Sequence, residues 1–162
     1  MFFEQFSRPL LARFGCRVRP WLTFNEINAF LELPFFAGAI PKELPELSSA
    51  ELYHALHHEL VASARVTRAA HEMIPGAQVG CMILAMPTYP LTPDPADVLA
   101  AMRAEQRNFA FGDVHCRGQY PSYLLAQLRS EGVTLDITDQ DREDLRNVVD
   151  FVSFSYYVSV CE

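Results

Sequence analysis

Trp21-Leu22-Thr23-Phe24-Asn25-Glu26-Ile27-Asn28 is the stretch of this 162-residue chain that decides its fold. It begins with residues that suit a buried strand and then changes abruptly to a polar sequence. Glu26 therefore comes directly after an apolar strand. In α/β and barrel enzymes the catalytic groups lie at the carboxyl ends of the strands. The stretch predicts a strand over residues 18–24 that is followed by a functional carboxylate.

The composition is that of a single globular domain. Half of the residues are hydrophobic and a fifth are charged, and the length suffices to bury a sizeable core. The net charge of −7 argues against a nucleic-acid-binding surface. No apolar run reaches the ~20 residues that a membrane helix needs. We therefore expect neither a nucleic acid nor a membrane as a partner.

The cysteines and histidines predict no disulfide and no metal site. The four cysteines (Cys16, Cys81, Cys116 and Cys161) are far apart and form no Cys-x-x-Cys pair, which is typical of free thiols in a reducing cytoplasm. No signal peptide is expected, because Phe2 and Phe3 are followed at once by Glu4. His54 and His58 are four residues apart, but the sequence offers neither a His-Glu-x-x-His motif nor a third ligand. We expect no metal and no cofactor.

The first half of the chain predicts two helices around the opening strand. Apolar residues at helical spacing predict a helix over residues 2–14, which Pro9 either kinks or starts. Residues 29–47 are rich in proline and glycine and predict a long loop at the mouth of the strand. Ser48 and Glu51 fit a capping box, which predicts a helix from residue 48 to about 73.

The second half adds two strands and three helices. Residues 78–85 form a nearly continuous apolar run, which is typical of a strand buried on both faces. A proline-rich loop over residues 86–95 follows, and Asp94 and Pro95 begin a helix that we expect to end near Gly112. The remaining predicted elements are a helix over 122–129, an acidic helix over 138–146 and a strand over 148–160.

This order of elements predicts an α/β fold with about three parallel strands. Helical crossovers make consecutive strands parallel and wind them with a right hand. The carboxyl ends of all the strands then lie on one side of the sheet. Glu26, the loop over 86–95 and the pair Tyr156 and Tyr157 are therefore expected to meet there.

The opening stretch resembles the fourth-strand motif of family 1 glycoside hydrolases, and further segments resemble that family in the same order over about residues 11–160. Ser155 and the segments around Cys81 and Thr88 are most similar to the bacterial 6-phospho-β-glucosidase branch. Many other family members have asparagine where Ser155 stands. The similar segments are Leu56-His57-His58-Glu59-Leu60-Val61-Ala62-Ser63-Ala64, Val79-Gly80-Cys81-Met82, Met86-Pro87-Thr88-Tyr89-Pro90, Asp113-Val114, Gly118-Gln119-Tyr120-Pro121 and Phe154-Ser155-Tyr156-Tyr157.

The resemblance implies a portion of a (β/α)8 TIM barrel, from the end of its third helix through its sixth strand. Such barrels typically need about 250 residues. We therefore interpret residues 1–162 as one incomplete catalytic domain. The family's nucleophile lies in an Ile/Val-Glu-Asn-Gly motif on the seventh strand, and no Glu-Asn-Gly occurs in these residues.

The resemblance also implies a role for three residues in a retaining mechanism. Glu26 would be the acid/base, Asn25 would donate to the 2-hydroxyl of the sugar, and Tyr157 would hold the nucleophile. An acid/base of this kind needs a carboxyl pKa raised toward neutrality by a neighbouring charge or a dry pocket. Neighbours in a regular strand point to opposite faces, so Asn25 and Glu26 can both reach the sugar only from an irregular strand end.

The implied function is a cytoplasmic 6-phospho-β-glucosidase that cleaves the O-glycosidic bonds of phosphorylated β-glucosides with retention. The isolated chain is expected to be inactive because the nucleophile is absent. Uncovered barrel edges predict self-association. Arg117 and Lys42 are interpreted as surface charges rather than phosphate ligands. The alternatives are a truncated remnant that binds sugars or partners without catalysis, and a small α/β domain unrelated to glycosidases.

Overall fold

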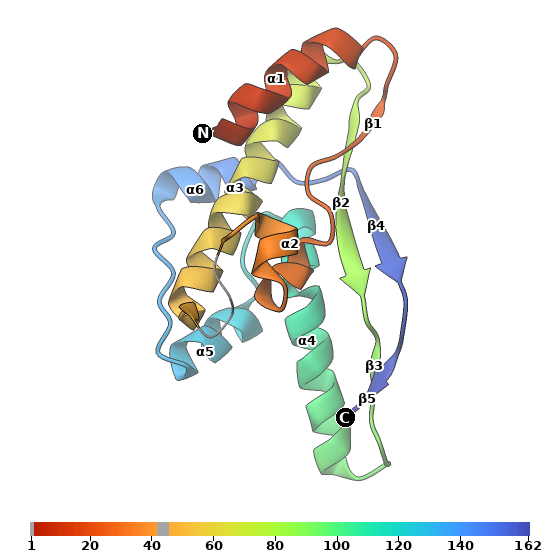
Figure 1. Ribbon diagram of the computed structural model, residues 1–162, viewed down its shortest axis with the longest axis vertical. Helices are drawn as coiled ribbons and strands as arrows, with labels where there is room; N and C mark the ends of the chain where they lie inside the picture. Colours follow the sequence, from red (N-terminus) through yellow and green to blue (C-terminus); the bar gives the residue numbers. More distant parts are fainter. Residues whose placement is uncertain (1, 42–45) are drawn as a thin grey trace.

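The computed structural model describes residues 2–41 and 46–162; Lys42, interpreted above as a surface charge, lies outside the described residues. The fold is α/β, as the sequence predicts. Three parallel strands form a sheet in the order β1 (Pro20–Leu22), β2 (Gln78–Ala85) and β4 (Phe151–Tyr156). Two short parallel strands, β3 (Thr88–Tyr89) and β5 (Val160–Cys161), extend it at the carboxyl end (Figure 1).

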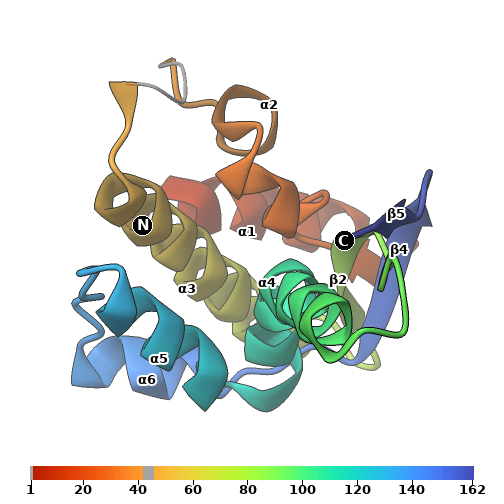
Figure 2. The same ribbon diagram turned by 90° about the horizontal axis from the view of Figure 1, so that it is seen from below.

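Helices cover one face of the sheet in two layers. The long helices α3 and α4 lie against β2, and α5 and α6 lie on the far side of these two helices from the sheet (Figures 1 and 2). Helix α6 packs against α3, and α5 packs against α4. Helix α1 packs beside α3 near the start of the strands. The helices are α1 (Phe2–Phe14), the 3-10 helix η1 (Ile27–Leu31), α2 (Pro34–Gly38), α3 (Ser49–Met73), α4 (Pro95–Arg117), α5 (Ser122–Ser130) and α6 (Asp139–Leu145).

The local signals for helix ends are confirmed. Ser48 and Glu51 form the predicted capping box at the start of α3, in which the Ser48 hydroxyl accepts from the Glu51 amide. The Asp94 carboxylate caps α4 by accepting from the Ala96 amide at 2.8 Å. Thr138 and Asp141 form a second capping box, at the start of α6. These contacts are local in sequence, which is why spacing alone predicts them.

Three predicted element boundaries are wrong. The first strand covers only Pro20–Leu22 of the predicted 18–24, because the chain then bends over residues 23–26. The predicted loop over 29–47 contains most of η1 and all of α2 instead, because Ile27 and Phe30 are buried in the core and hold the chain in turns. Helix α4 runs past Gly112 to Arg117, and Gly118 ends it with φ 67.

Two glycines lie inside regular elements, Gly112 in α4 and Gly80 in β2. Gly112 lies within α4, where a Cβ would stand in ordinary contact with Ile83 at 3.7 Å, so neither packing nor a turn requires glycine there. In β2 a side chain on Gly80 would meet the ring of Phe151 at 2.4 Å. Glycine at this position lets that ring lie across the neighbouring strand.

The carboxyl-terminal part of the sheet is also more divided than predicted. The expected loop over 86–95 contains β3, and the expected single strand over 148–160 is split into β4 and β5. β3 pairs with β5 in parallel, with Thr88 opposite Val160. A loop and a strand end that are far apart in sequence are thereby joined just beyond the main sheet.

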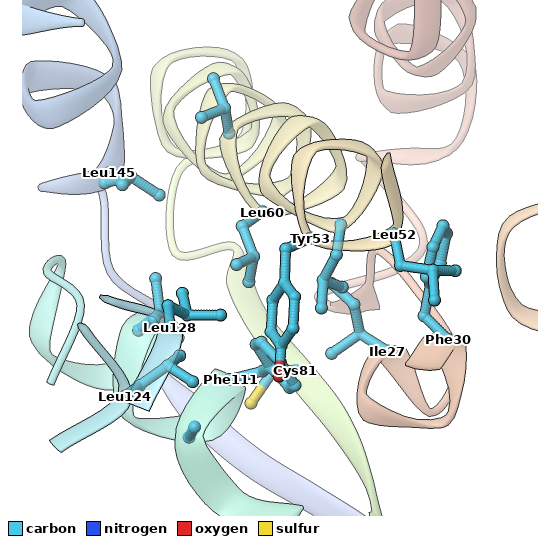
Figure 3. Close-up of a cluster of buried hydrophobic side chains, with 14 of the residues drawn as sticks. Ile27, Phe30, Leu52, Tyr53, Leu60, Cys81, Phe111, Leu124, Leu128 and Leu145 are labelled. Carbon is cyan, nitrogen blue, oxygen red and sulfur yellow. The ribbon is translucent and has the colours of Figure 1, made fainter. Parts of the chain in front are cut away.

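The main core lies between β2 and the helices (Figure 3). Tyr53 and Leu60 of α3 point toward Cys81 of β2 and Phe111 of α4. Leu128 of α5 and other leucines of α5 and α6 close the far side. No helix in the described ranges combines the length and the apolarity that crossing a membrane requires.

Candidate active site

Glu26 occupies a strained position at the point where the sheet gives way to η1. It follows the bend after β1 and precedes η1 with φ 48 and ψ 49, the left-handed region. A residue with a side chain costs roughly 1–2 kcal/mol there, so the surrounding structure must impose it. The strand end is therefore irregular, which is the condition that the implied roles of Asn25 and Glu26 require.

Tyr157 contacts Glu26 and follows β4, the strand at the opposite edge of the sheet from β1. It follows the last residue of β4, and its hydroxyl donates a hydrogen bond to Glu26 Oε1 at 3.1 Å. The two residues are 131 positions apart in sequence. They meet because β1 and β4 both run parallel to β2, which lies between them. The carboxyl ends of all three strands therefore lie at the same end of the sheet. The structure thus brings together two of the three predicted site residues.

Asn25 is the third predicted residue, and it lies exposed in the bend beside Glu26. Its side chain makes no hydrogen bond with any residue in the described ranges. The amide is therefore accessible at the mouth of the strands, next to the carboxylate. This placement leaves its predicted contact with a sugar hydroxyl untested.

Asn28 is a residue of the site that the sequence analysis missed. Its side-chain amide is buried, where Nδ2 donates to the Leu84 carbonyl and Oδ1 accepts from the Leu84 amide, each at 2.8 Å. Leu84 pairs with Ser155 of β4 in the sheet, and Ser155 is two residues before Tyr157 in the sequence. Asn28 therefore anchors η1 to the carboxyl end of β2. Glu26, which precedes η1, is held near the end of β4 that Tyr157 follows. The available signal was a polar residue set among the buried residues Ile27, Ala29 and Phe30.

The loop after β2 does not reach Glu26 by any hydrogen bond among the described residues. The Thr88 amide donates to Glu105 Oε1 of α4 at 2.6 Å, and β3 pairs with β5. The loop therefore lies at the same end of the sheet as Glu26, next to the segment that follows Tyr157. The expected convergence holds for the strand ends, whereas this loop is held back against α4.

The residues considered for other kinds of site have ordinary partners. Within the described ranges, no group of three or more histidine, cysteine, aspartate or glutamate side chains is placed to hold a metal ion. His54 Nε2 lies 3.0 Å from the Thr134 carbonyl. Arg117 is exposed and pairs with Asp113 of the same helix at 3.0 Å, so it is a surface charge as predicted. All four cysteines are free thiols, of which Cys81 alone is buried.

Comparison with known proteins agrees with the sequence resemblance. The model of glycosyl hydrolase family 1 matches residues 1–162. The chain is 47% identical over 159 residues to a 6-phospho-beta-glucosidase of Dickeya chrysanthemi, covering 98% of this chain and 34% of that protein. It is 44% identical over 160 residues to a phospho-cellobiase of Klebsiella oxytoca, covering 99% of this chain and 34% of that protein. It therefore spans about a third of the length of these curated relatives.

The fold matches solved structures over nearly the whole chain. A beta-glucosidase from Thermotoga maritima in complex with glucoimidazole superposes with a TM-score of 0.81 at 25% identity, covering 98% of this chain and 36% of that one. A beta-glucosidase from Exiguobacterium marinum superposes with a TM-score of 0.80 at 23% identity. The predicted portion of a (β/α)8 barrel is thereby confirmed.

Proposed function

Because the chain belongs to glycosyl hydrolase family 1, we propose that it forms the acid/base part of a retaining 6-phospho-β-glucosidase. The observation that carries this proposal is the hydrogen bond from Tyr157 to Glu26, which joins the carboxyl ends of two strands. Residues 1–162 would be an incomplete catalytic domain, completed by chain that carries the nucleophile.

Glu26 would act twice in each turnover. It first protonates the oxygen of the leaving group and then takes a proton from the water that attacks the glycosyl-enzyme intermediate. Asn25, exposed beside it, would donate to the 2-hydroxyl, a contact that strengthens in the transition state. These roles require a second carboxylate about 5–5.5 Å away as the nucleophile. No Glu-Asn-Gly occurs in residues 1–162, so this chain alone is expected to be inactive.

Tyr157 could then serve both carboxylates in turn. A phenolic hydroxyl has a single proton to donate, and in this structure that proton goes to Glu26. A protonated Glu26 no longer needs this hydrogen bond, which frees the Tyr157 proton for the nucleophile. Tyr157 would therefore orient the nucleophile while Glu26 is the acid and stabilise Glu26 once it is ionised.

The names of the relatives support the substrate class. The relatives include 6-phospho-beta-glucosidases, a phospho-cellobiase and aryl-phospho-beta-D-glucosidases, at up to 47% identity. We therefore propose a phosphorylated β-glucoside as the substrate. A phosphate ester does not cross a membrane unaided, so such a substrate fits an enzyme of the cytoplasm.

A chimaera tests the role of Glu26 directly. Residues 1–162 would replace the matching segment of the Dickeya relative, and hydrolysis of an alkyl and of a dinitrophenyl 6-phospho-β-glucoside would be measured. Glu26→Gln should lower kcat/KM on the alkyl substrate by about 10²–10⁴-fold, the usual contribution of general acid catalysis. The loss in the first step should be smaller with dinitrophenol, which needs no protonation to leave. Azide, a nucleophile that needs no general base, should restore breakdown of the intermediate.

Glu32→Gln is the matched control, because Glu32 is an exposed carboxylate only six positions away. A loss below tenfold for Glu26→Gln, equal to that of the control, would rule out Glu26 as the acid/base. The isolated 162-residue chain should show no turnover. Turnover that Glu26→Gln abolishes in the isolated chain would demand a nucleophile within it.

A non-catalytic remnant is the second candidate; residues 1–162 contain no Glu-Asn-Gly motif in either case. Such a remnant would at most bind sugars or partners. The intact mass of the native protein in its source cells separates the two candidates. A mass well above 18.3 kDa supports an enzyme with its nucleophile elsewhere in the chain, whereas a mass of 18.3 kDa supports the remnant.

A further inference from the structure

A cavity of about 550 Å³ opens between α5, the segment 133–137 and α6. This volume is within the range of small-molecule sites. In the ribbon views, α3 and α4 separate α5 and α6 from the sheet, so the cavity is remote from the strand ends beside Glu26 and Tyr157 (Figures 1 and 2). The proposed glycosidase chemistry therefore gives this cavity no role.

The walls of the cavity combine an apolar floor with a cationic rim. Leu128 and Leu145 belong to the buried core and form part of the floor (Figure 3). Arg129, Arg142 and Arg146 stand among the lining residues, which include no aspartate and no glutamate. We call this site the arginine cavity. Its other lining residues are Gly118, Gln119, Tyr120, Leu125, Val133, Thr134, Leu135 and Ile137.

Two of the acidic side chains of α6, Asp141 and Asp144, are bonded to residues outside the wall of the arginine cavity. Asp141 accepts from the Thr138 hydroxyl at 2.7 Å and lies 3.4 Å from His57 Nε2. Asp144 is buried and accepts from Arg68 of α3 at 2.9 Å. Asp144 thus compensates the charge of Arg68, and Asp141 caps α6. Neither carboxylate forms an ion pair with Arg129 or Arg142 of the rim.

Two of the three rim arginines are left without a counter-ion. Arg146 pairs with Glu143 at 3.0 Å. Arg129 and Arg142 make no hydrogen bond or ion pair with any residue in the described ranges. Two guanidinium groups without a counter-ion beside one cavity favour an anionic ligand.

Two polar groups of the wall, the Tyr120 hydroxyl and the Thr134 carbonyl, already have hydrogen-bond partners. The Tyr120 hydroxyl lies 2.9 Å from His57 Nδ1, and the Thr134 carbonyl is bonded to His54. Tyr120 therefore presents its ring rather than a free hydroxyl. A sugar with many hydroxyls would find few partners here, whereas an aromatic group would displace water from leucine side chains.

We propose that the arginine cavity binds a phosphate monoester that carries an apolar group, such as an aryl phosphate. Arg129 and Arg142 bind the phosphate through charge-assisted hydrogen bonds, for which the guanidinium fork is suited. The leucine floor takes the apolar group. This site is independent of Glu26, so it stands or falls separately from the glycosidase activity.

Titration of the 162-residue chain with phenyl phosphate, followed by calorimetry or by NMR shifts, tests this proposal. We expect saturable binding with a dissociation constant on the order of 1 mM. The double variant Arg129→Gln/Arg142→Gln should weaken it at least about tenfold. Inorganic phosphate, which lacks the apolar group, and benzyl alcohol, which lacks the charge, should each bind at least about tenfold more weakly.

Arg117→Gln is the matched control, because Arg117 is exposed on α4 and is not part of the cavity wall. It should leave the titration unchanged, and the melting temperature should show that all variants fold. Absence of saturation at about 10 mM, or a double variant that binds like the control, would overturn the proposal. Equal binding of inorganic phosphate would overturn the ligand class. The same titration in the chimaera replaces this one if self-association obscures the signal.

Discussion

Strands β2 and β4 are neighbours in register, yet one is covered and the other is bare. Cys81 and Ile83 of β2 are 1% and 2% exposed, whereas their partners Val152 and Phe154 of β4 are 52% and 67% exposed on the same face of the sheet. The two pairs have similar apolar character. What differs is that α3 and α4 lie against β2, while among the described residues no helix lies over β4 (Figure 2).

The bare face of β4 forms one side of an apolar groove. Phe154 and Tyr156 line it together with Ile83 and Phe109, and its volume is about 470 Å³. In a (β/α)8 barrel each strand is followed by a helix that covers it. The apolar pattern of a strand therefore indicates that the strand needs cover, not that cover is present. Three predictions test this contrast.

Truncation of the covered strand should have the largest effect. Ile83→Ala removes a buried side chain from the core and should lower the free energy of unfolding by about 3 kcal/mol. Phe154→Ala removes a larger side chain, but one that is mostly exposed, and should cost less than about 0.5 kcal/mol. Urea denaturation of both variants gives the comparison.

Self-association of the same two variants provides a second readout. Phe154→Ala should reduce association in sedimentation velocity, because it shrinks the exposed apolar face. Ile83→Ala should not reduce it. Equal losses of stability in the two variants would mean that β4 is covered in solution, for example by a second copy of the chain.

The helix that covers β2 should make stability depend on pH. Burial lowers the pKa of His115 on α4 to about 4, from an ordinary value of 6.5. The fold thus favours the neutral ring, so this contribution is complete above pH 6.5 and is lost as the pH falls toward 4. Unfolding at about pH 5 should require roughly 2 kcal/mol less than at pH 7 on this account.

The variant His115→Gln should flatten this pH dependence, and His58→Gln on the exposed side of α3 is the control. Burial also lowers the pKa of His57 and raises the pKa of Glu59 to about 7, and these two shifts act with opposite signs between pH 7 and pH 5. The diagnostic quantity is therefore the difference in slope between the wild type and His115→Gln. Identical slopes between pH 7 and pH 5 in the wild type and in His115→Gln would contradict the assignment to His115.

The anchor at the carboxyl end of β2 should have the smallest effect on stability and a specific effect on the site. Asn28→Ala leaves the Leu84 amide and carbonyl without their side-chain partner and should cost about 1–2 kcal/mol. It should also release Glu26 from its left-handed conformation. The hydroxyl and ring NMR signals of Tyr157 would then shift, because its partner Glu26 moves.

Asn147→Ala separates this effect from general destabilisation. Asn147 is partly buried, and its Nδ2 donates to the Asp144 carbonyl at 2.7 Å, so its loss should cost a comparable free energy. The Tyr157 signals should not change in this variant. If both variants shifted Tyr157 equally, Asn28 would have no particular role in placing Glu26.

Local signals in the sequence predicted the elements whose causes are local. The capping box of Ser48 and Glu51, the cap at Asp94 and the apolar run over 78–85 all gave elements that the structure contains. Boundaries that depend on distant partners were missed. Gly112 was expected to end α4 because a glycine often does so, but the helix continues to Arg117 and ends at Gly118 instead.

The site shows the same division. The sequence alone determined that a carboxylate follows the first strand, that the strands are parallel and that no Glu-Asn-Gly motif is present, because these follow from residue order and crossover length. The bond of Asn28 to Leu84, the left-handed conformation of Glu26 and the contact of Tyr157 with Glu26 depend instead on how distant segments pack. Each of these contacts joins residues at least 56 positions apart or is imposed by such a contact, and local propensity contains no information about a partner at that distance.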